Sequence, residues 1–128
     1  NVSYIASYKD IRIELVRLQR GIANDRNVVM DGRDIGSHVL PNADVKIFQI
    51  AEANERARRR YKENLEKGIN SSFDSILENV KKRDYIDSHR EFSPLVAAKD
   101  CITIDTTYMS IEDVVNEILK ICKSKGIE

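Results

Sequence analysis

The sequence lacks tryptophan, contains only two prolines and two cysteines, and is poor in aromatic residues, which make up 6% of its 128 positions. Two cysteines are too few for a disulfide framework. Cys101 and Cys122 both lie in apolar runs, which is typical of buried thiols in a reducing compartment. The sequence also lacks a signal peptide and any run of 18 apolar residues, so it predicts a cytoplasmic protein without a membrane span.

An excess of either charge is missing as well. Lys+Arg 21 balance Asp+Glu 21, giving a formal net charge of +0, although charged residues make up 33% of the chain. This balance argues against bulk binding to nucleic acid or to a membrane, but a local basic patch can exist within a neutral total. The length and the 41% of hydrophobic residues predict one domain, residues 1–128, with a buried core.

What is present is an alternation of strand-like and helix-like segments. Apolar patterns predict strands at 28–30, 45–50 and 101–105. They predict helices at about 10–20 with Asp10 as the cap and Gly21 as the stop, at 51–67 before Gly68, and from Ser71 or Ser72 onward. A last helix begins at Ser110 with Asp113 in a capping box, and its apolar residues, Val115 and Leu119 among them, face the core. The unbroken apolar run at 28–30 favours a strand buried on both faces. This order predicts an α/β fold, a parallel sheet with flanking helices.

The motif Asp-Gly-Arg-Asp-Ile-Gly at 31–36 follows the first predicted strand directly. Asp31 would therefore stand at the carboxyl end of the strand, where open α/β sheets bind their ligands. Gly32 allows a sharp turn there, and Arg33 can hold a phosphate or carboxylate through two parallel hydrogen bonds. The alternative is a turn with an exposed ion pair.

A second motif lies at 82–90, and it is helical if the helix that begins at Ser71 or Ser72 continues through it. Arg83, Asp87 and Arg90 are spaced i, i+4 and i+7, and they continue the apolar stripe that includes Val80. Charged side chains are not placed toward a core unless they are paired or bind something. This spacing indicates an anion site with a carboxylate beside it, suited to a phosphate next to a sugar hydroxyl. A surface salt bridge within the helix is the alternative.

Four arginines occupy the five positions 56–60, so they cover most of a helix circumference. They form either a solvated basic face or a cationic lid over a polyphosphate, because mobile arginines stabilise the charge that develops in phosphoryl transfer. His38 and His89 have no metal-ligand spacing, and no Ser-His-Asp order is present, so zinc and hydrolase functions have little support.

Taken in order, these segments closely resemble bacterial cytidylate kinases. The resemblance rests on the 31–36 motif, Leu-Pro at 40–41, Lys-Ile-Phe at 46–48, Glu-Arg-Ala-x-Arg-Arg at 55–60, Lys-Arg-Asp-x-x-Asp-Ser-x-Arg at 82–90, Ser-Pro-Leu at 93–95, and Ile-Asp-Thr-Thr at 104–107 before Ser-Ile-Glu at 110–112. It implies a partial P-loop NTPase fold of the nucleoside monophosphate kinase type. It also implies transfer of the γ-phosphoryl group of ATP to CMP or dCMP with Mg²⁺.

The resemblance implies roles for individual residues. CMP would be bound through its phosphate, ribose and base, ATP would be covered by an arginine lid, and one acid would hold Mg²⁺ through water. These roles fall on Arg33 and Arg90 (CMP phosphate), Arg83 and Asp87 (phosphate and ribose), Asp34 (cytosine amino group), Ser3 and Arg12 (base), Arg56, Arg59 and Arg60 (lid), Asp31 (Mg²⁺), and Arg33, Arg59 and Arg60 (catalysis).

The sequence departs from the family at one decisive feature, because no G-x-x-x-x-G-K-[ST] motif occurs in it. That P-loop supplies the N–H groups and the lysine that cradle the phosphates of ATP. We therefore expect the C-terminal part of a longer kinase, inactive alone, whose partner is the missing N-terminal half. In the family's sheet the P-loop strand separates 28–30 from 45–50. We expect these strands to close the gap directly, or a dimer to fill it.

Two other functions stay open. A non-catalytic module could use the 56–60 run and the Arg83 and Arg90 face to hold RNA or another polyanion. The balanced charge and the absence of exposed-looking aromatic residues beside the arginines disfavour it. A kinase of the same fold acting on another small substrate is the second alternative.

Overall fold

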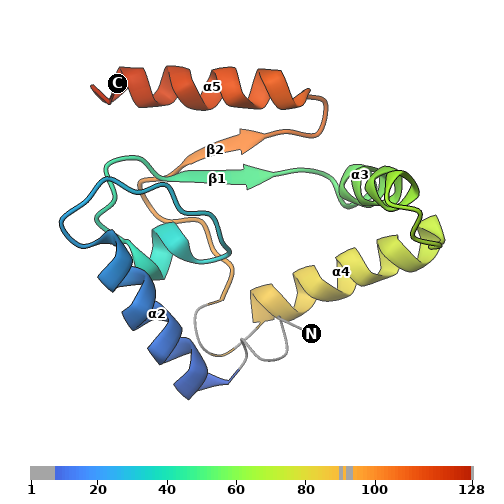
Figure 1. Cartoon of the computed structure of the whole chain (residues 1–128), viewed down its shortest axis with the longest axis horizontal. Coiled ribbons are helices and arrows are strands. Elements are labelled where there is room, and N and C mark those ends of the chain that lie inside the picture. Colours follow the sequence, from blue (N-terminus) through green and yellow to red (C-terminus); the bar gives the residue numbers. More distant parts are fainter. Residues whose placement is uncertain (1–7, 90, 92–93, 128) are drawn as a thin grey trace.

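The computed structural model describes residues 8–89, 91 and 94–127 (Figure 1). Ser3 and Arg90, to which the sequence gives binding roles, lie outside the described residues. The elements in chain order are α2 (Lys9–Ala23), a wide helical turn η1 (Ile35–Val39), β1 (Ile47–Ile50), α3 (Ala53–Glu66), α4 (Phe73–His89), β2 (Ile102–Asp105) and α5 (Ile111–Ser124).

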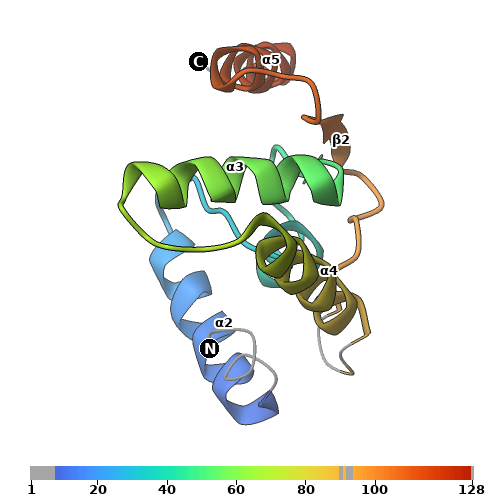
Figure 2. The same cartoon turned by 90° about the vertical axis from the view of Figure 1, so that its right-hand side faces the viewer.

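The two described strands form a parallel ladder, which confirms the predicted α/β class. Ile47 is in register with Ile102, and Ile50 with Asp105. The strands are connected through α3 and α4, as a parallel pair requires a long crossover. Figures 1 and 2 show α5 above β2, and α3 and α4 beyond the end of the strands. The carboxyl ends of β1 and β2 therefore face the α3–α4 pair.

The predicted strand at 28–30 is wrong. These residues have no regular structure, and Val29 is fully exposed. A strand forms only where another backbone accepts and donates its ladder hydrogen bonds. β1 pairs with β2, and among the described residues no strand lies on the other edge of β1. The expected direct closure between 28–30 and β1 is therefore also wrong, whereas filling by a second chain stays a prediction.

The clearest core lies between α3 and α4. Ala57 is fully buried and packs with Ile76 and Val80, while Tyr61 and Phe73 meet edge to face with ring centroids 6.4 Å apart. Helix α3 ends just before Gly68, whose φ of +67° is a left-handed backbone conformation that glycine adopts without strain. The Ser72 hydroxyl accepts a hydrogen bond from the Ser75 amide, and this local bond favours the start of α4.

The termini of the other helices agree less evenly with the sequence. Ser110 and Asp113 form the predicted capping box at the start of α5. Asp10 does not cap α2, because the cap position is Tyr8, and the helix continues past Gly21 to Ala23. None of the described helices combines the length and apolarity that a membrane span needs.

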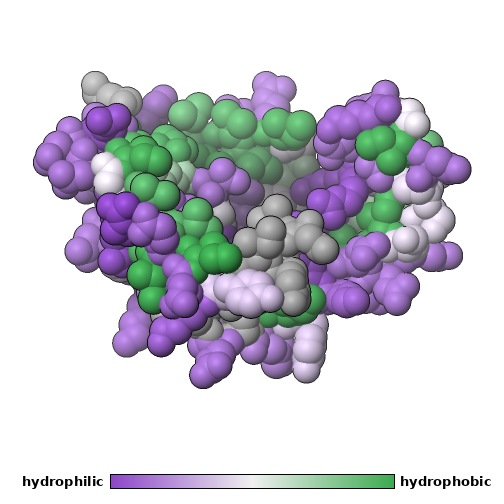
Figure 3. Space-filling model, turned by 60° about the horizontal axis from the view of Figure 1, so that its bottom comes forward, coloured by the Kyte–Doolittle hydropathy of each residue, from purple (hydrophilic) through white to green (hydrophobic). Residues whose placement is uncertain are grey.

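A large part of the apolar surface is not covered. On α5 only Ile121 is buried, whereas Val115 and Leu119, which the pattern assigns to the core, are about half exposed. Figure 3 shows apolar side chains in a band across the centre and left of one face, and hydrophilic side chains crowding the side where α3 and α4 lie. The sheet is too narrow to cover the apolar side of α5.

The α3–α4 core predicts the response to overpacking. Replacing the fully buried Ala57 with leucine should lower the free energy of unfolding by about 1–3 kcal/mol, because no space is left for the larger side chain. Urea unfolding followed by circular dichroism measures this change. The control Lys62→Leu adds the same side chain at an exposed position of the same helix and should change it by less than about 0.5 kcal/mol. Equal effects would contradict the packing.

Candidate phosphate-binding site

A cavity of about 270 Å³ lies between α3, α4 and the 31–34 segment. Its wall carries five arginines against two acids, so the cavity is positively charged and suited to an anion. The lining residues are Arg33, Arg56, Arg59, Arg60, Glu63, Val80, Arg83 and Asp84. The arginines come from three places that are far apart in the sequence.

A buried carboxylate joins two of these places. Asp87 on α4 has a side chain only 3% exposed, and its Oδ2 lies 3.1 Å from Arg33 Nε and 3.7 Å from Arg83 Nε. Burial lowers the pKa of Arg33, while the charge of Asp87 opposes that shift. The structure therefore brings Arg33, Arg83 and Asp87 together, as the i, i+4 spacing and the 31–36 motif predict.

Asp34 and Arg12, both predicted at the base of the nucleotide, also lie together. Asp34 is 5% exposed and forms an ion pair with Arg12 of α2. The backbone carbonyl of Asp34 accepts hydrogen bonds from the amides of His38 and Val39. These bonds close the turn η1 onto the residue that precedes it. The pair thus joins α2 to η1 beside Arg33.

Arg56 connects α3 to α4. Its NH1 and NH2 donate to the two carboxylate oxygens of Asp84 at 2.8 and 2.6 Å, and its Nε donates to the carbonyl of Ala51 at 2.9 Å. The bidentate pair raises the pKa of Arg56 and lowers that of Asp84. Sequence reasoning gave Asp84 no role, although it stands next to Arg83 in the Lys-Arg-Asp motif.

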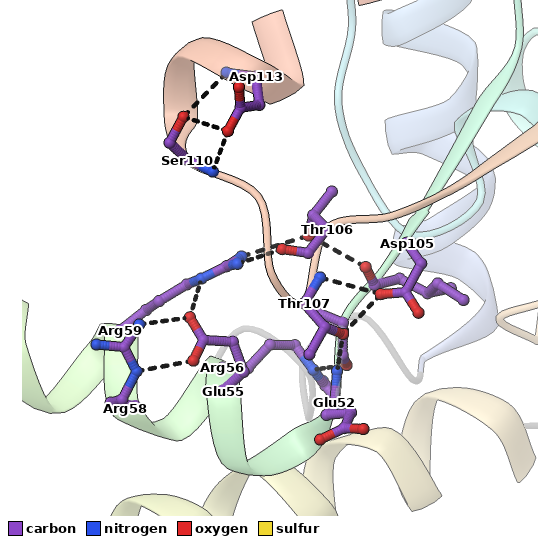
Figure 4. Close-up of polar contacts among 12 residues, drawn as sticks. Glu52, Glu55, Arg56, Arg58, Arg59, Asp105, Thr106, Thr107, Ser110 and Asp113 are labelled. Carbon is purple, nitrogen blue, oxygen red and sulfur yellow. Dashed lines mark hydrogen bonds and ion pairs between the residues drawn. The ribbon is translucent and has the colours of Figure 1, made fainter. Parts of the chain in front are cut away.

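Arg59 reaches from α3 to the segment that follows β2 (Figure 4). Its NH2 donates to the carbonyl of Thr106, its NH1 to the Thr106 hydroxyl at 3.3 Å, and its Nε to Glu55 Oε1 at 2.8 Å. The Thr106 hydroxyl in turn donates to the carbonyl of Ile50. Arg59 therefore ties the basic helix to the carboxyl ends of both strands.

The other arginines of the run differ in exposure and partners. Arg58 faces solvent, with a side chain 67% exposed, and pairs with Glu55. Arg60 lines the cavity beside Glu63, whose pKa is lowered mainly by Lys67 and further by Arg60. The run is thus neither a purely solvated face nor a purely inward one, because the helix turns successive residues to different sides.

Asp31 is exposed and does not line the cavity. Within the described part of the chain, no group of three or more acids, histidines or cysteines could hold a metal ion. The described residues therefore form no dedicated Mg²⁺ site. Asp31 supplies a single carboxylate, which suits only a metal that takes its other ligands from phosphate oxygens and water.

The parallel strands, the flanking helices and the arginine-lined cavity define an α/β domain with a site suited to phosphate groups. The comparison with known proteins gives the particular family. The family model described as cytidylate kinase matches residues 1–124. The chain therefore belongs to the cytidylate kinase family, and its two strands and flanking helices are part of a nucleoside monophosphate kinase fold.

Individual relatives agree. The chain is 54% identical to a cytidylate kinase of Leuconostoc mesenteroides over 97% of its own length and 55% of that protein. It is 57% identical to one of Fusobacterium nucleatum over 94% of its length and 55% of the relative, and 51% identical to one of Enterococcus faecalis over 99% and 56%. The chain thus spans about half the length of the curated relatives it matches.

The Glu55 cluster predicts a titration. Hydrogen bonds from Arg58, and secondarily from Arg59, lower the pKa of Glu55 from 4.5 to about 2. Because the pKa of Glu55 is lower in the folded chain than in the unfolded chain, the ionised carboxylate stabilises the fold. This contribution is complete above the ordinary pKa of 4.5 and is lost as the pH falls through about 2. NMR of the Glu55 carboxyl should give this pKa. Arg58→Met should raise it more than Arg59→Met, and Arg60→Met should leave it unchanged. An equal shift in all three variants would contradict the specific pairing.

Proposed function

We propose that this chain is the acceptor-binding part of a cytidylate kinase that converts CMP or dCMP to CDP or dCDP with ATP. The observation that supports the proposal is that Arg33 and Arg83 both line the cavity and both lie against the buried carboxylate of Asp87. Two cations around a buried carboxylate suit a phosphate monoester with a sugar hydroxyl beside it, because the arginines bind the phosphate and the carboxylate accepts from the hydroxyl. Arg90 would add a further phosphate contact.

The base would lie toward Asp34 and Arg12, with Ser3 near them. A carboxylate accepts a hydrogen bond from an exocyclic amino group, which cytosine has and uracil lacks. Asp34 already pairs with Arg12, so its orientation is fixed before a nucleotide binds. This preorganisation would favour cytosine over uracil.

The reaction joins an oxygen of the CMP phosphate to the γ-phosphorus of ATP while the bond to the β,γ-bridging oxygen breaks, which gives CDP and ADP. Arg33, Arg59 and Arg60 would stabilise the charge on the transferred group, and Arg59 would exchange its Thr106 contacts for phosphate oxygens. Mg²⁺, held in part through Asp31, would neutralise the phosphates of ATP when bound.

The partner would be the N-terminal half present in the longer relatives. β1 has no described neighbour on one edge, and apolar groups at Val29, Val115 and Leu119 are exposed. A further parallel strand at this edge would satisfy the backbone and cover apolar surface. A dimer through the same edge is the alternative. The free, half-buried Cys101 and Cys122 suit a reducing compartment, and we place the protein in the cytoplasm.

Reconstitution tests this function. The chain should phosphorylate CMP only when joined to the N-terminal part of the Leuconostoc relative, because it contains no P-loop. A coupled ADP-release assay with CMP, dCMP, UMP and AMP measures the activity. Comparable CMP phosphorylation by the chain alone would contradict the proposal. Activity of the joined protein on a different acceptor would favour another small-molecule kinase.

A matched pair of arginine variants tests the acceptor site. In the joined protein, Arg33→Met should raise KM for CMP by about 10- to 100-fold, the value of one lost charged hydrogen bond of ~1.5–3 kcal/mol. Arg17→Met on α2, which removes only an exposed pair with Glu14, should leave KM unchanged. Short RNA at low and high salt is the competing ligand, and strong RNA binding without preference for CMP would favour a polyanion-binding module.

A further inference from the structure

An acid in the wall of an anion site weakens binding unless it has another task. Asp84 lines the arginine cavity, and its charge opposes any phosphate that enters. Its two oxygens are both engaged by Arg56. The side chains of both residues are 35% exposed, so screening by solvent leaves the pair with little weight in overall stability. The pair therefore matters through its geometry.

The donors of Arg56 point to protein and not to open space. NH1 and NH2 bind Asp84 on α4, and Nε binds the carbonyl of Ala51, which follows β1. Arg56 thus connects the exit of β1, the first turns of α3, and α4. The next residue, Ala57, is fully buried against Val80. The contact closes the end of the helix pair opposite the connecting loop at residues 67–72.

We propose that Arg56 and Asp84 are positioning residues that set the spacing between the arginines of α3 and those around Asp87, and that Arg56 does not itself bind phosphate. The proposal rests on the phosphate site proposed above and deepens it. Arg59 and Arg60 project from α3, whereas Arg83 projects from α4 and Arg33 reaches Asp87 on that helix. The Arg56–Asp84 pair is the charged bridge between the two helices at the level of the cavity. A change in their separation would move one pair of cations relative to the other.

The two possible roles of Asp84 predict opposite effects of Asp84→Asn. If Asp84 acts only through its charge, the variant should bind inorganic triphosphate more tightly. If Asp84 positions Arg56 and α3, it should bind about tenfold more weakly, because a displacement of about 1 Å is costly in a multidentate site. Isothermal titration of the 128-residue chain measures this difference. Asp74→Asn, on the same helix but outside the cavity wall, is the matched control and should bind as the native chain does.

A charge exchange separates positioning from direct binding by Arg56. Arg56→Met should weaken triphosphate binding under either role. The double variant Arg56→Asp with Asp84→Arg rebuilds the bridge in reverse and should restore affinity to within about threefold of the native chain. If the double variant stays as weak as Arg56→Met while its thermal unfolding is native-like, Arg56 is a phosphate ligand and the proposal is wrong.

Hydrogen exchange at the guanidinium gives a second readout that needs no ligand. The NH1 and NH2 hydrogens of Arg56, which donate to Asp84, should be protected in the free chain, lose protection in Asp84→Asn, and keep their NMR shifts when triphosphate is added. Rapid exchange in the native chain, or a large shift on adding triphosphate, would overturn the proposal. A native chain that binds no triphosphate would refute the proposed function, and the exchange result would then still decide whether the Arg56–Asp84 bridge exists.

Discussion

The structure depends on keeping like charges close together without mutual repulsion. Five arginines surround one cavity, and each approach of two guanidinium groups is unfavourable unless a carboxylate stands near them. Asp87 lies between Arg33 and Arg83. Asp84 forms an ion pair with Arg56, and Glu55 forms ion pairs with Arg58 and Arg59. These acids hold four of the cavity arginines, Arg33, Arg56, Arg59 and Arg83, in defined directions, and the proposed phosphate site would use this preorganisation.

The paired charges lie beside the apolar contacts of the helix pair around the cavity. Ala57, Ile76 and Val80 supply a small apolar core, and the Arg56–Asp84 bridge lies where that core ends. On the strand side the opposite holds, because the parallel ladder is narrow and α5 keeps Val115 and Leu119 half exposed. The described residues thus bring five arginines of the charged site together, whereas they form a sheet of only two strands.

The sequence was sufficient wherever the determining interactions are local. The capping box of Ser110, the end of α3 at Gly68, and the shared face of Arg83 and Asp87 all follow from residues within one or two helical turns, and all appear in the structure. The alternation of strands and helices likewise predicted the parallel ladder. Recurrent local spacing is the signal that single-sequence reasoning reads best.

The failures lie where the outcome depends on distant partners. The apolar run at 28–30 has strand composition, but a strand is defined by the backbone beside it, and none of the described segments takes that place. The bridge from Arg56 to Asp84 joins residues 28 positions apart, so no local spacing announces it. Arg90 and Ser3, to which the sequence also gives binding roles, lie outside the described residues.

Among the described residues, one edge of β1 has no strand beside it, and this has a consequence for the chain in solution. Unpaired backbone donors and acceptors at a strand edge can form hydrogen bonds with an extended peptide. The burial of neighbouring apolar side chains would stabilise such a complex. Self-association through this edge would increase with protein concentration. It would compete with binding of the N-terminal half at the same edge. A polypeptide that binds along the edge of β1 would therefore block self-association, and it would raise the solubility of the whole chain.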